Sequence, residues 1–246
     1  MVKEENELLP YVLSELPPGP WIVFAPHPDD ETFGMGGSLL LARQKNIETH
    51  VVFVTDGAQG GSGDRQALIE KRVEEAREAA AALQIDTIHF FAEPDRGLTL
   101  SQDLFDRVTG LMQKVQPRSV FFPTPMEYHP DHRKTAELVW ACARSNSGFD
   151  TEAYSYEISN LAPINVLIDV SSVAEMKYEA VKIYASQLTQ AKYLALVQAV
   201  DTARTFSLPI ETVAAEGFFH YADKSRSLMD QYTETIPPFF EGIASQ

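Results

Sequence analysis

The chain of 246 residues carries 20 basic and 35 acidic side chains, and so has a formal net charge of −15. Its composition, 44% hydrophobic and 22% charged, is that of a globular protein rather than a disordered one. The acidic balance argues against a nucleic-acid-binding protein, which would show a basic stripe. It still leaves room for a small basic site that binds an anionic substrate.

The single cysteine, Cys142, rules out a disulfide framework and an all-cysteine metal site. The first residues are acidic and lack the apolar stretch of a signal peptide. No run of about 18 apolar residues suggests a membrane-spanning helix. We therefore expect a cytoplasmic protein without a transmembrane segment.

Short apolar strands alternate with helices through the first half of the chain. We expect strands over 21–25, 50–55, 87–91 and 119–122, each followed by a helix, over 37–45, 68–83, 104–115 and 133–144. This alternation predicts an α/β fold with a mostly parallel, Rossmann-like sheet and helices on both faces.

The second half of the chain is less regular. Strands are expected over 153–158 and 165–169, helices over 172–186 and 191–204, and an irregular tail, 236–240, packed on the body. Since no linker, repeat or low-complexity segment divides the chain, we expect one domain over 1–246.

Two clusters of histidine and acidic residues follow strands of this predicted sheet. His27-Pro28-Asp29-Asp30-Glu31 comes directly after the first strand, and His129-Pro130-Asp131-His132 follows the fourth. Ligands of open parallel sheets bind beyond the carboxyl ends of the strands, so both clusters are expected at one edge.

Imidazole and carboxylate groups are suitable ligands for a divalent transition metal, above all zinc. His27, Asp30 and one of the two later histidines would supply three ligands and leave a position open for water. Asp29 and the remaining histidine would then be available as base and acid. The alternative is that the aspartates cap helices, which fits either cluster alone as well as a metal does. Both clusters at one sheet edge favour the metal.

The same residues resemble the signatures of a known family, the LmbE-like, PIG-L-type N-deacetylases. The similarity begins with residues 25–31 and Gly36-Gly37 and includes the second cluster, 129–132. It continues through 55–57 with Gly60, Gly61 and Gly63, Arg72 with 75–76 and 79–80, and 94–95 with 97–98, and then through the late features 165–171, Lys177 with 186–187, and 215–216 with Phe218, which are weak alone.

This resemblance implies an LmbE-like fold and a hydrolase with one zinc ion, or another divalent transition metal, per chain. Its substrate would be a small amino-sugar conjugate from which it removes the acetyl group of an N-acetylglucosamine-type moiety. Carried over residue by residue, the ligands would be His27, Asp30 and His132.

The resemblance also implies roles for the remaining site residues. Asp29 would be the general base, and His129, oriented by Asp131, would stabilise the oxyanion or protonate the leaving amine. Arg72 and Asp95 would contact the sugar or a group attached to it. The residues do not determine whether the protein forms a homo-oligomer.

Several other residues have structural interpretations. The glycines of 57–63 are expected to form a flexible wall of the cleft, and His89 to be a packed core histidine. Asp169 is expected to cap the following helix, and Cys142 to be buried and inert.

Two other function classes stay open at this point. One is a non-catalytic sugar- or metal-binding module, which should have lost Asp29 or a ligand. The other is a nucleotide-binding enzyme of the same architecture, weakly suggested by the glycines of 34–37 and by Asp56.

Overall fold

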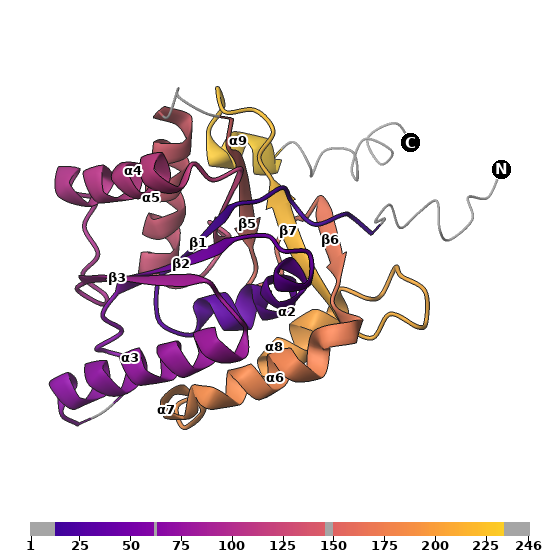
Figure 1. Cartoon of the computed structure of the whole chain (residues 1–246), viewed down its shortest axis with the longest axis horizontal. Coiled ribbons are helices and arrows are strands. Elements are labelled where there is room, and N and C mark those ends of the chain that lie inside the picture. Colours follow the sequence, from indigo (N-terminus) through magenta and orange to yellow (C-terminus); the bar gives the residue numbers. More distant parts are fainter. Residues whose placement is uncertain (1–12, 62, 146–149, 234–246) are drawn as a thin grey trace, which may run out of the picture.

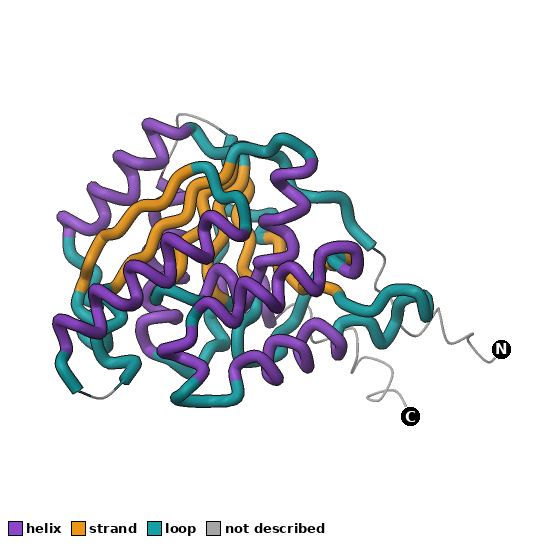
Figure 2. The backbone as a smooth tube through the Cα atoms, turned by 60° about the horizontal axis from the view of Figure 1, so that its bottom comes forward, coloured by secondary structure: helices purple, strands orange, loops and turns teal. Residues whose placement is uncertain are grey.

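The computed structural model describes residues 13–61, 63–145 and 150–233, whose strands form one seven-stranded sheet (Figures 1 and 2). The strand order is β3-β2-β1-β4-β5-β7-β6. In chain order the strands are β1 (Trp21–Ala25), β2 (Thr49–Thr55), β3 (Thr87–Glu93), β4 (Ser119–Pro123), β5 (Glu152–Tyr156), β6 (Val166–Asp169) and β7 (Ala215–His220).

The first five strands pair in parallel, whereas β7 runs antiparallel between β5 and β6. The expectation of a mostly parallel sheet is confirmed. The strands β1, β2 and β4 are buried along their whole length, as expected for apolar runs covered on both faces.

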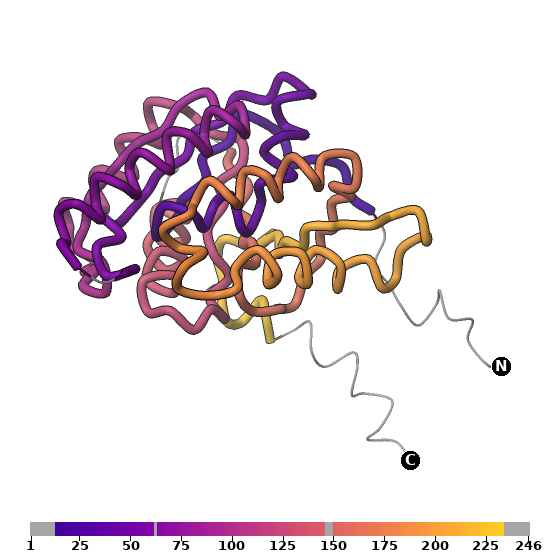
Figure 3. Tube along the Cα trace, turned by 90° about the horizontal axis from the view of Figure 1, so that it is seen from below, coloured from indigo at the N-terminus to yellow at the C-terminus, as the bar shows by residue number. Residues whose placement is uncertain are grey.

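The helices are α2 (Asp30–Gln44), α3 (Arg65–Ala82), α4 (Gln102–Val115), α5 (Pro130–Ser145), α6 (Ala174–Ile183), α7 (Ala185–Leu188), α8 (Tyr193–Ala203) and α9 (Leu228–Thr233), with a 3-10 turn at Ser171–Val173. Helices α2, α3, α6 and α8 cover one face of the sheet, and α4 and α5 cover the other (Figure 1). Seen from below, α3 and α6 lie side by side although they are far apart in the sequence (Figure 3).

Helix α2 begins at Asp30, seven residues before its expected start. Glycine lowers helix propensity, so Gly34, Gly36 and Gly37 argue against a helix from sequence alone. Close packing explains why glycine is needed in this helix, because a Cβ on Gly34 would lie 2.4 Å from the ring of Tyr156.

A buried carboxylate from β7 holds helix α2 at its centre. Met35 (φ −150°) interrupts the helix, and just beyond it the N–H groups of Gly37 and Ser38 donate to Glu216, each over 2.8 Å. Glu216 also pairs with the fully buried Lys177 at 2.8 Å, and Lys177 pairs with Asp201 at 2.8 Å. We call Lys177, Asp201 and Glu216 the ion triad. It fastens the helix to the late part of the chain.

Other differences from the expected elements lie in the second half. The expected helix 172–186 is divided at Tyr184, whose hydroxyl donates to Glu31 over 2.6 Å. Strand β7 and helix α9 were not expected. The expected tail over 236–240 lies outside the described residues, and a single domain over 1–246 stays a prediction.

The smaller structural predictions gave mixed results. Cys142 is fully buried, as expected. The prediction that Asp169 caps the following helix is wrong: it accepts the N–H of Ser171 over 2.8 Å in the 3-10 turn, whereas α6 begins three residues later at Ala174 without a side-chain cap. The prediction for His89 is wrong. Its side chain is only partly buried, and its Nε2 lies 3.2 Å from Nδ1 of His50, on the neighbouring strand.

Candidate active site

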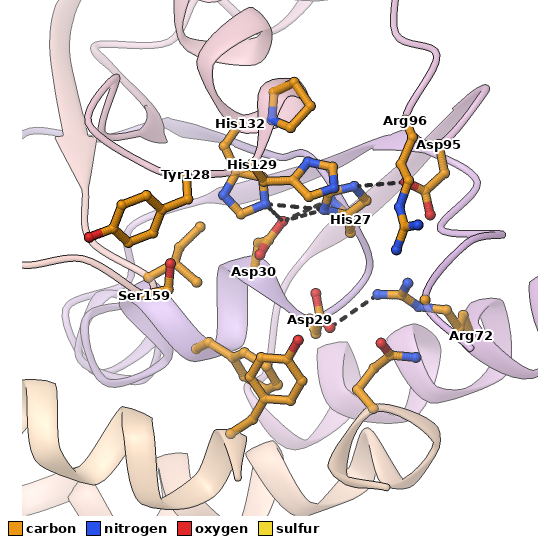
Figure 4. A pocket seen from close by; sticks show the side chains of 16 residues that line it. His27, Asp29, Asp30, Arg72, Asp95, Arg96, Tyr128, His129, His132 and Ser159 are labelled. Atoms are coloured by element: carbon orange, nitrogen blue, oxygen red, sulfur yellow. Dashed lines mark hydrogen bonds and ion pairs between the residues drawn. The ribbon is translucent and has the colours of Figure 1, made fainter. Parts of the chain in front are cut away.

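The loops after β1, β2, β3 and β4 meet at one edge of the sheet and line a pocket of about 410 Å³ (Figure 4). Both histidine-aspartate clusters contribute to it, as expected for segments that follow parallel strands. Among the sequence-predicted site residues, its lining includes His27, Asp29, Asp30, Arg72, Asp95, His129 and His132. Asp131 is buried just behind it.

Three side chains direct one ligand atom each at a common point. Nδ1 of His27, Oδ2 of Asp30 and Nε2 of His132 lie 3.2 Å from one another. Ligand atoms about 2.0–2.2 Å from a tetrahedral zinc ion are themselves about 3.3–3.6 Å apart, so the three atoms fit such an ion closely. Burial alone would raise the pKa of Asp30, but the two histidines hold it well below its usual range.

The second ring nitrogen of His27 faces further carboxylates. Nε2 lies 3.3 Å from Oδ1 of Asp95 and 3.6 Å from Oδ2 of Asp131. Burial lowers the pKa of His27, but Asp131, Asp30 and Asp95 together raise it well above its usual value. Such carboxylates fix the tautomer of a metal-binding histidine. Asp95, expected at the sugar, thus also contacts His27.

Asp29 is held apart from the three converging atoms by an arginine. Its Oδ2 accepts from the Arg72 guanidinium over 3.0 Å, and that guanidinium also donates to the carbonyls of Pro28 and Gly57. Burial raises the pKa of Asp29 well above its usual value, although Arg72 opposes this effect. The backbone of Asp29 has φ +141°, which is strained for a residue with a Cβ.

His129 stands beside the three converging atoms as a neutral imidazole. Burial, His27 and His132 lower the pKa of His129 to about 4. The N–H of Asp131 donates to Nδ1 of His129 over 3.2 Å, whereas the Asp131 carboxylate is 4.0 Å away. The contact that sets the tautomer is therefore made by the backbone of Asp131, and it leaves the hydrogen on Nε2 of the neutral ring.

Sequence reasoning missed two buried acids that support the site. Glu127 accepts from the backbone of Ile158 and Ser159 over 3.1 and 2.9 Å, and its Oε2 lies 3.8 Å from Nδ1 of His132. Glu31 accepts from the hydroxyl of Tyr184 and from the N–H of Asp29. The only signals were that Glu31 ends the first cluster and that Glu127 lies just before the second.

The glycine loop after β2 serves to accommodate Arg72. A Cβ on Gly57 or Gly60 would lie 2.7 or 2.5 Å from an Arg72 nitrogen. Gly60 lines the pocket, as expected for a wall, but the glycines there allow close packing. The nucleotide-binding alternative loses its support, because the glycines of 34–37 lie buried inside α2 and Asp56 binds the N–H groups of Ala58 and Asp95.

Aromatic rings form part of the remaining wall of the pocket. Phe33 and Tyr193 lie with their ring centroids 5.3 Å apart, and Tyr128 is 75% exposed. A flat apolar surface beside polar groups suits the faces of a sugar ring.

The described residues offer further metal donors around His27. Nitrogens of His27, His129 and His132 lie within 4.8 Å of one another, and a second such group joins His27 and His129 to Asp95 and Asp131. The shorter 3.2 Å separations favour His27, Asp30 and His132 as the primary set.

None of the helices among the described residues has the length and apolar character needed to span a membrane.

Residues 22–143 match the family model of PIG-L, the GlcNAc-PI de-N-acetylases. The chain is 29% identical to the diacetylchitobiose deacetylase of Thermococcus kodakarensis over 67% of this chain and 68% of that protein. It is 27% identical to a probable N-acetyl-alpha-D-glucosaminyl L-malate deacetylase 2 of Bacillus subtilis, over 68% of this chain and 82% of that one.

A solved structure extends the likeness of fold. GalB, the 4-carboxy-2-hydroxymuconate hydratase of Pseudomonas putida, superposes with a TM-score of 0.74 at 21% identity and covers 84% of this chain and 97% of its own. Since a hydratase shares this fold, the chemistry has to be argued from the site.

Proposed function

Because residues 22–143 place this chain in the PIG-L family of LmbE-like deacetylases, we propose that it is a metal-dependent amino-sugar deacetylase. It hydrolyses the acetamide of an N-acetylglucosamine-type moiety in a small conjugate. One zinc ion per chain is held by His27, Asp30 and His132.

The observation that carries the proposal is the triangle of donor atoms from these three residues, 3.2 Å on each side, next to a separately held carboxylate. Three ligands with an open fourth position are typical of catalytic rather than structural zinc sites. A bound zinc ion would polarise the acetamide carbonyl and lower the pKa of a water molecule.

Asp29 acts as the general base in this proposal. Its carboxylate adjoins the ligand Asp30 in the chain, yet its nearest partner is Arg72 at 3.0 Å. The pKa raised by burial makes Asp29 a stronger proton acceptor than an exposed aspartate. Once protonated, it holds the proton that the departing amine needs.

His129 stabilises the oxygen that becomes negative when water adds to the acetamide carbon. Its pKa of about 4 keeps the ring neutral near pH 7, and Nε2 carries the hydrogen that can be donated. Of the two roles considered for His129, this geometry favours oxyanion stabilisation over protonation of the amine.

Arg72 and Asp95 are proposed to contact the sugar with the parts of their side chains that face the pocket. The pocket volume of about 410 Å³ suits a ligand of small-molecule size. The polar wall of Arg72 and Asp95 and the aromatic wall of Phe33 and Tyr193 together give a sugar both hydrogen-bonding and apolar partners.

Acetate release tests the proposal. We expect the zinc-loaded protein to release acetate from N,N'-diacetylchitobiose or from N-acetylglucosaminyl malate, and chelation to abolish the release until zinc is restored. Elemental analysis should show close to one zinc per chain. A zinc-binding protein that releases no acetate from any N-acetylglucosamine conjugate would instead be the non-catalytic module.

A further inference from the structure

Arg96 has an unusual backbone beside the pocket. It follows Asp95 after β3 and has φ +59°, a left-handed conformation that favours glycine. The next residue is a glycine, Gly97, but the strained angle lies on the arginine. The N–H of Arg96 donates to the buried Oδ2 of Asp131 over 2.6 Å, which fixes the backbone in place.

The Arg96 side chain supplies an accessible positive charge. It lines the pocket on the same side as Asp95 and Arg72 (Figure 4), and it is exposed. Within the described residues its side chain makes one hydrogen bond, to the carbonyl of Gln59 over 3.1 Å, and no ion pair. Arg72 is only 2% exposed and already has three acceptors, so it cannot offer the same charge.

Any amino acid except proline could supply the backbone bond to Asp131, and glycine would supply it without strain. The side chain is therefore what distinguishes Arg96 from a better-fitting residue. Strained positions next to a site are often kept because the side chain is needed there.

We propose that Arg96 recognises an anionic group, a carboxylate or a phosphate, on the substrate of the proposed deacetylase, and so favours charged over neutral conjugates. The planar guanidinium offers paired donors that match the oxygens of either group. A local positive charge is needed because the protein as a whole carries −15 and repels anions. This inference rests on the proposed function.

Two matched substrate pairs test the inference. One is N-acetylglucosaminyl malate and its dimethyl ester, which differ in charge but little in size. The other is N-acetylglucosamine 6-phosphate and N-acetylglucosamine, which places the anion on the sugar. We expect kcat/KM of the wild type to favour the anionic member of at least one pair.

In Arg96→Gln and Arg96→Gly, that preference should fall about tenfold or more, whereas Arg96→Lys should keep part of it. The substrate pair whose preference falls in the Arg96 variants shows whether the recognised anion is a carboxylate of the malate or a phosphate on the sugar. The melting temperature of Arg96→Gly should be at or above that of the wild type. Arg65→Gln is the control, since Arg65 is 56% exposed, pairs with Asp56 and does not line the pocket. This variant also removes one positive charge, and it should leave the ratio of kcat/KM values unchanged in both substrate pairs.

The inference is overturned if both ratios are unchanged in the Arg96 variants. It is also overturned if both members of each pair lose activity equally while the melting temperature falls, because Arg96 would then only pack the loop. Calorimetric binding of glucosaminyl malate and its dimethyl ester, which lack the acetyl group, keeps this test separate from turnover. If no substrate is deacetylated but Arg96→Gln still loses the binding preference, the proposed function fails and the anion site stands.

Discussion

Asp29 and Asp30 are neighbours of the same type whose carboxylates have different partners. Asp30 joins two imidazoles, whereas Asp29 faces Arg72. We expect Asp30→Asn to lower zinc content, since an amide is a weaker and neutral ligand. Asp29→Asn should keep the zinc and lose about 100-fold or more in rate, the usual effect of a positioned base. Elemental analysis and acetate release on both variants measure this difference.

The assignment of these two acids is wrong if Asp29→Asn keeps the full rate, or if it is the variant that loses zinc. Wild-type protein treated with a chelator serves as the control, because it shows how far the rate falls when the metal alone is removed.

Arg72 offers a second test at this scale, because its guanidinium holds Asp29 at 3.0 Å. Burial raises the pKa of Asp29 and Arg72 opposes that rise. In Arg72→Ala the pKa of Asp29 should rise further, so less of the base is ionised at a given pH. The acid limb of the pH–rate profile should therefore move to higher pH while the zinc stays bound.

Arg77→Ala, on the exposed side of the same helix, should leave the profile in place. If Arg72→Ala raises KM without moving the acid limb, Arg72 contacts the sugar and does not tune the base.

The candidate ligands His27 and Asp30 could be predicted because they belong to a short cluster that follows a strand. The second cluster left His129 and His132 as alternatives, and only the family resemblance favoured His132. The buried acids could not be predicted, since their partners are remote in sequence. Glu127 binds the backbone of Ile158, 31 residues later, and Glu216 binds that of Gly37, 179 residues earlier. The left-handed angle of Arg96 likewise depends on a tertiary contact, with Asp131.

At the scale of elements, helix α2 depends on the ion triad. The N–H groups of Gly37 and Ser38, in its second half, donate two hydrogen bonds to Glu216, which also pairs with the buried Lys177. Glu216→Gln should lower the free energy of unfolding by about 2–3 kcal/mol, because a charge-assisted cap is weakened and Lys177 loses one of its two carboxylates. Urea unfolding measures the loss. Glu211→Gln, on an exposed loop, should have no such effect.

An unchanged unfolding midpoint in Glu216→Gln would show that the triad contributes little to stability, as when desolvation of three buried charges cancels their attraction. A midpoint shift together with zinc loss would show that the triad also positions Asp30.

The strands β1 to β4 could be predicted because each contains an apolar run and is followed by a helix. Strand β7 could not, since Glu216 and Gly217 interrupt its apolar pattern. Their roles depend on contacts in the folded chain. Glu216 accepts hydrogen bonds from α2, and a Cβ on Gly217 would lie 2.7 Å from Glu157. The early start of α2 was missed for the same kind of reason.

At the scale of the whole molecule, Cys142 reports on unfolding. Burial raises the pKa of its thiol to about 12, from an ordinary value of 9.0. A raised pKa stabilises the folded state fully below pH 9, and this contribution is lost as the pH rises from 9 towards 12. At pH 10 the thiol is ionised in the unfolded chain but not in the folded one, and this should lower the free energy of unfolding by about 1.4 kcal/mol.

The difference in unfolding free energy between wild type and Cys142→Ala, followed from pH 7.5 to pH 10, isolates this effect from that of other groups. In native protein the thiol should also resist alkylation. Rapid native alkylation, or a difference that does not change with pH, would contradict the burial of Cys142.

The hydrogen bonds between helix α2 and Glu216, a member of the ion triad, also affect the order in which the site can form during synthesis. All three proposed ligands, and the whole segment matched by the family model, are made by residue 143, but Glu216 is made much later. When the three ligands have left the ribosome, Glu216, which accepts hydrogen bonds from α2, the helix of Asp30, has not yet been released. Lys177 also follows later in the chain. Zinc loading should thus follow completion of the chain, and a nascent chain long enough to expose His132 but stalled before Glu216 should bind the metal weakly despite holding every ligand.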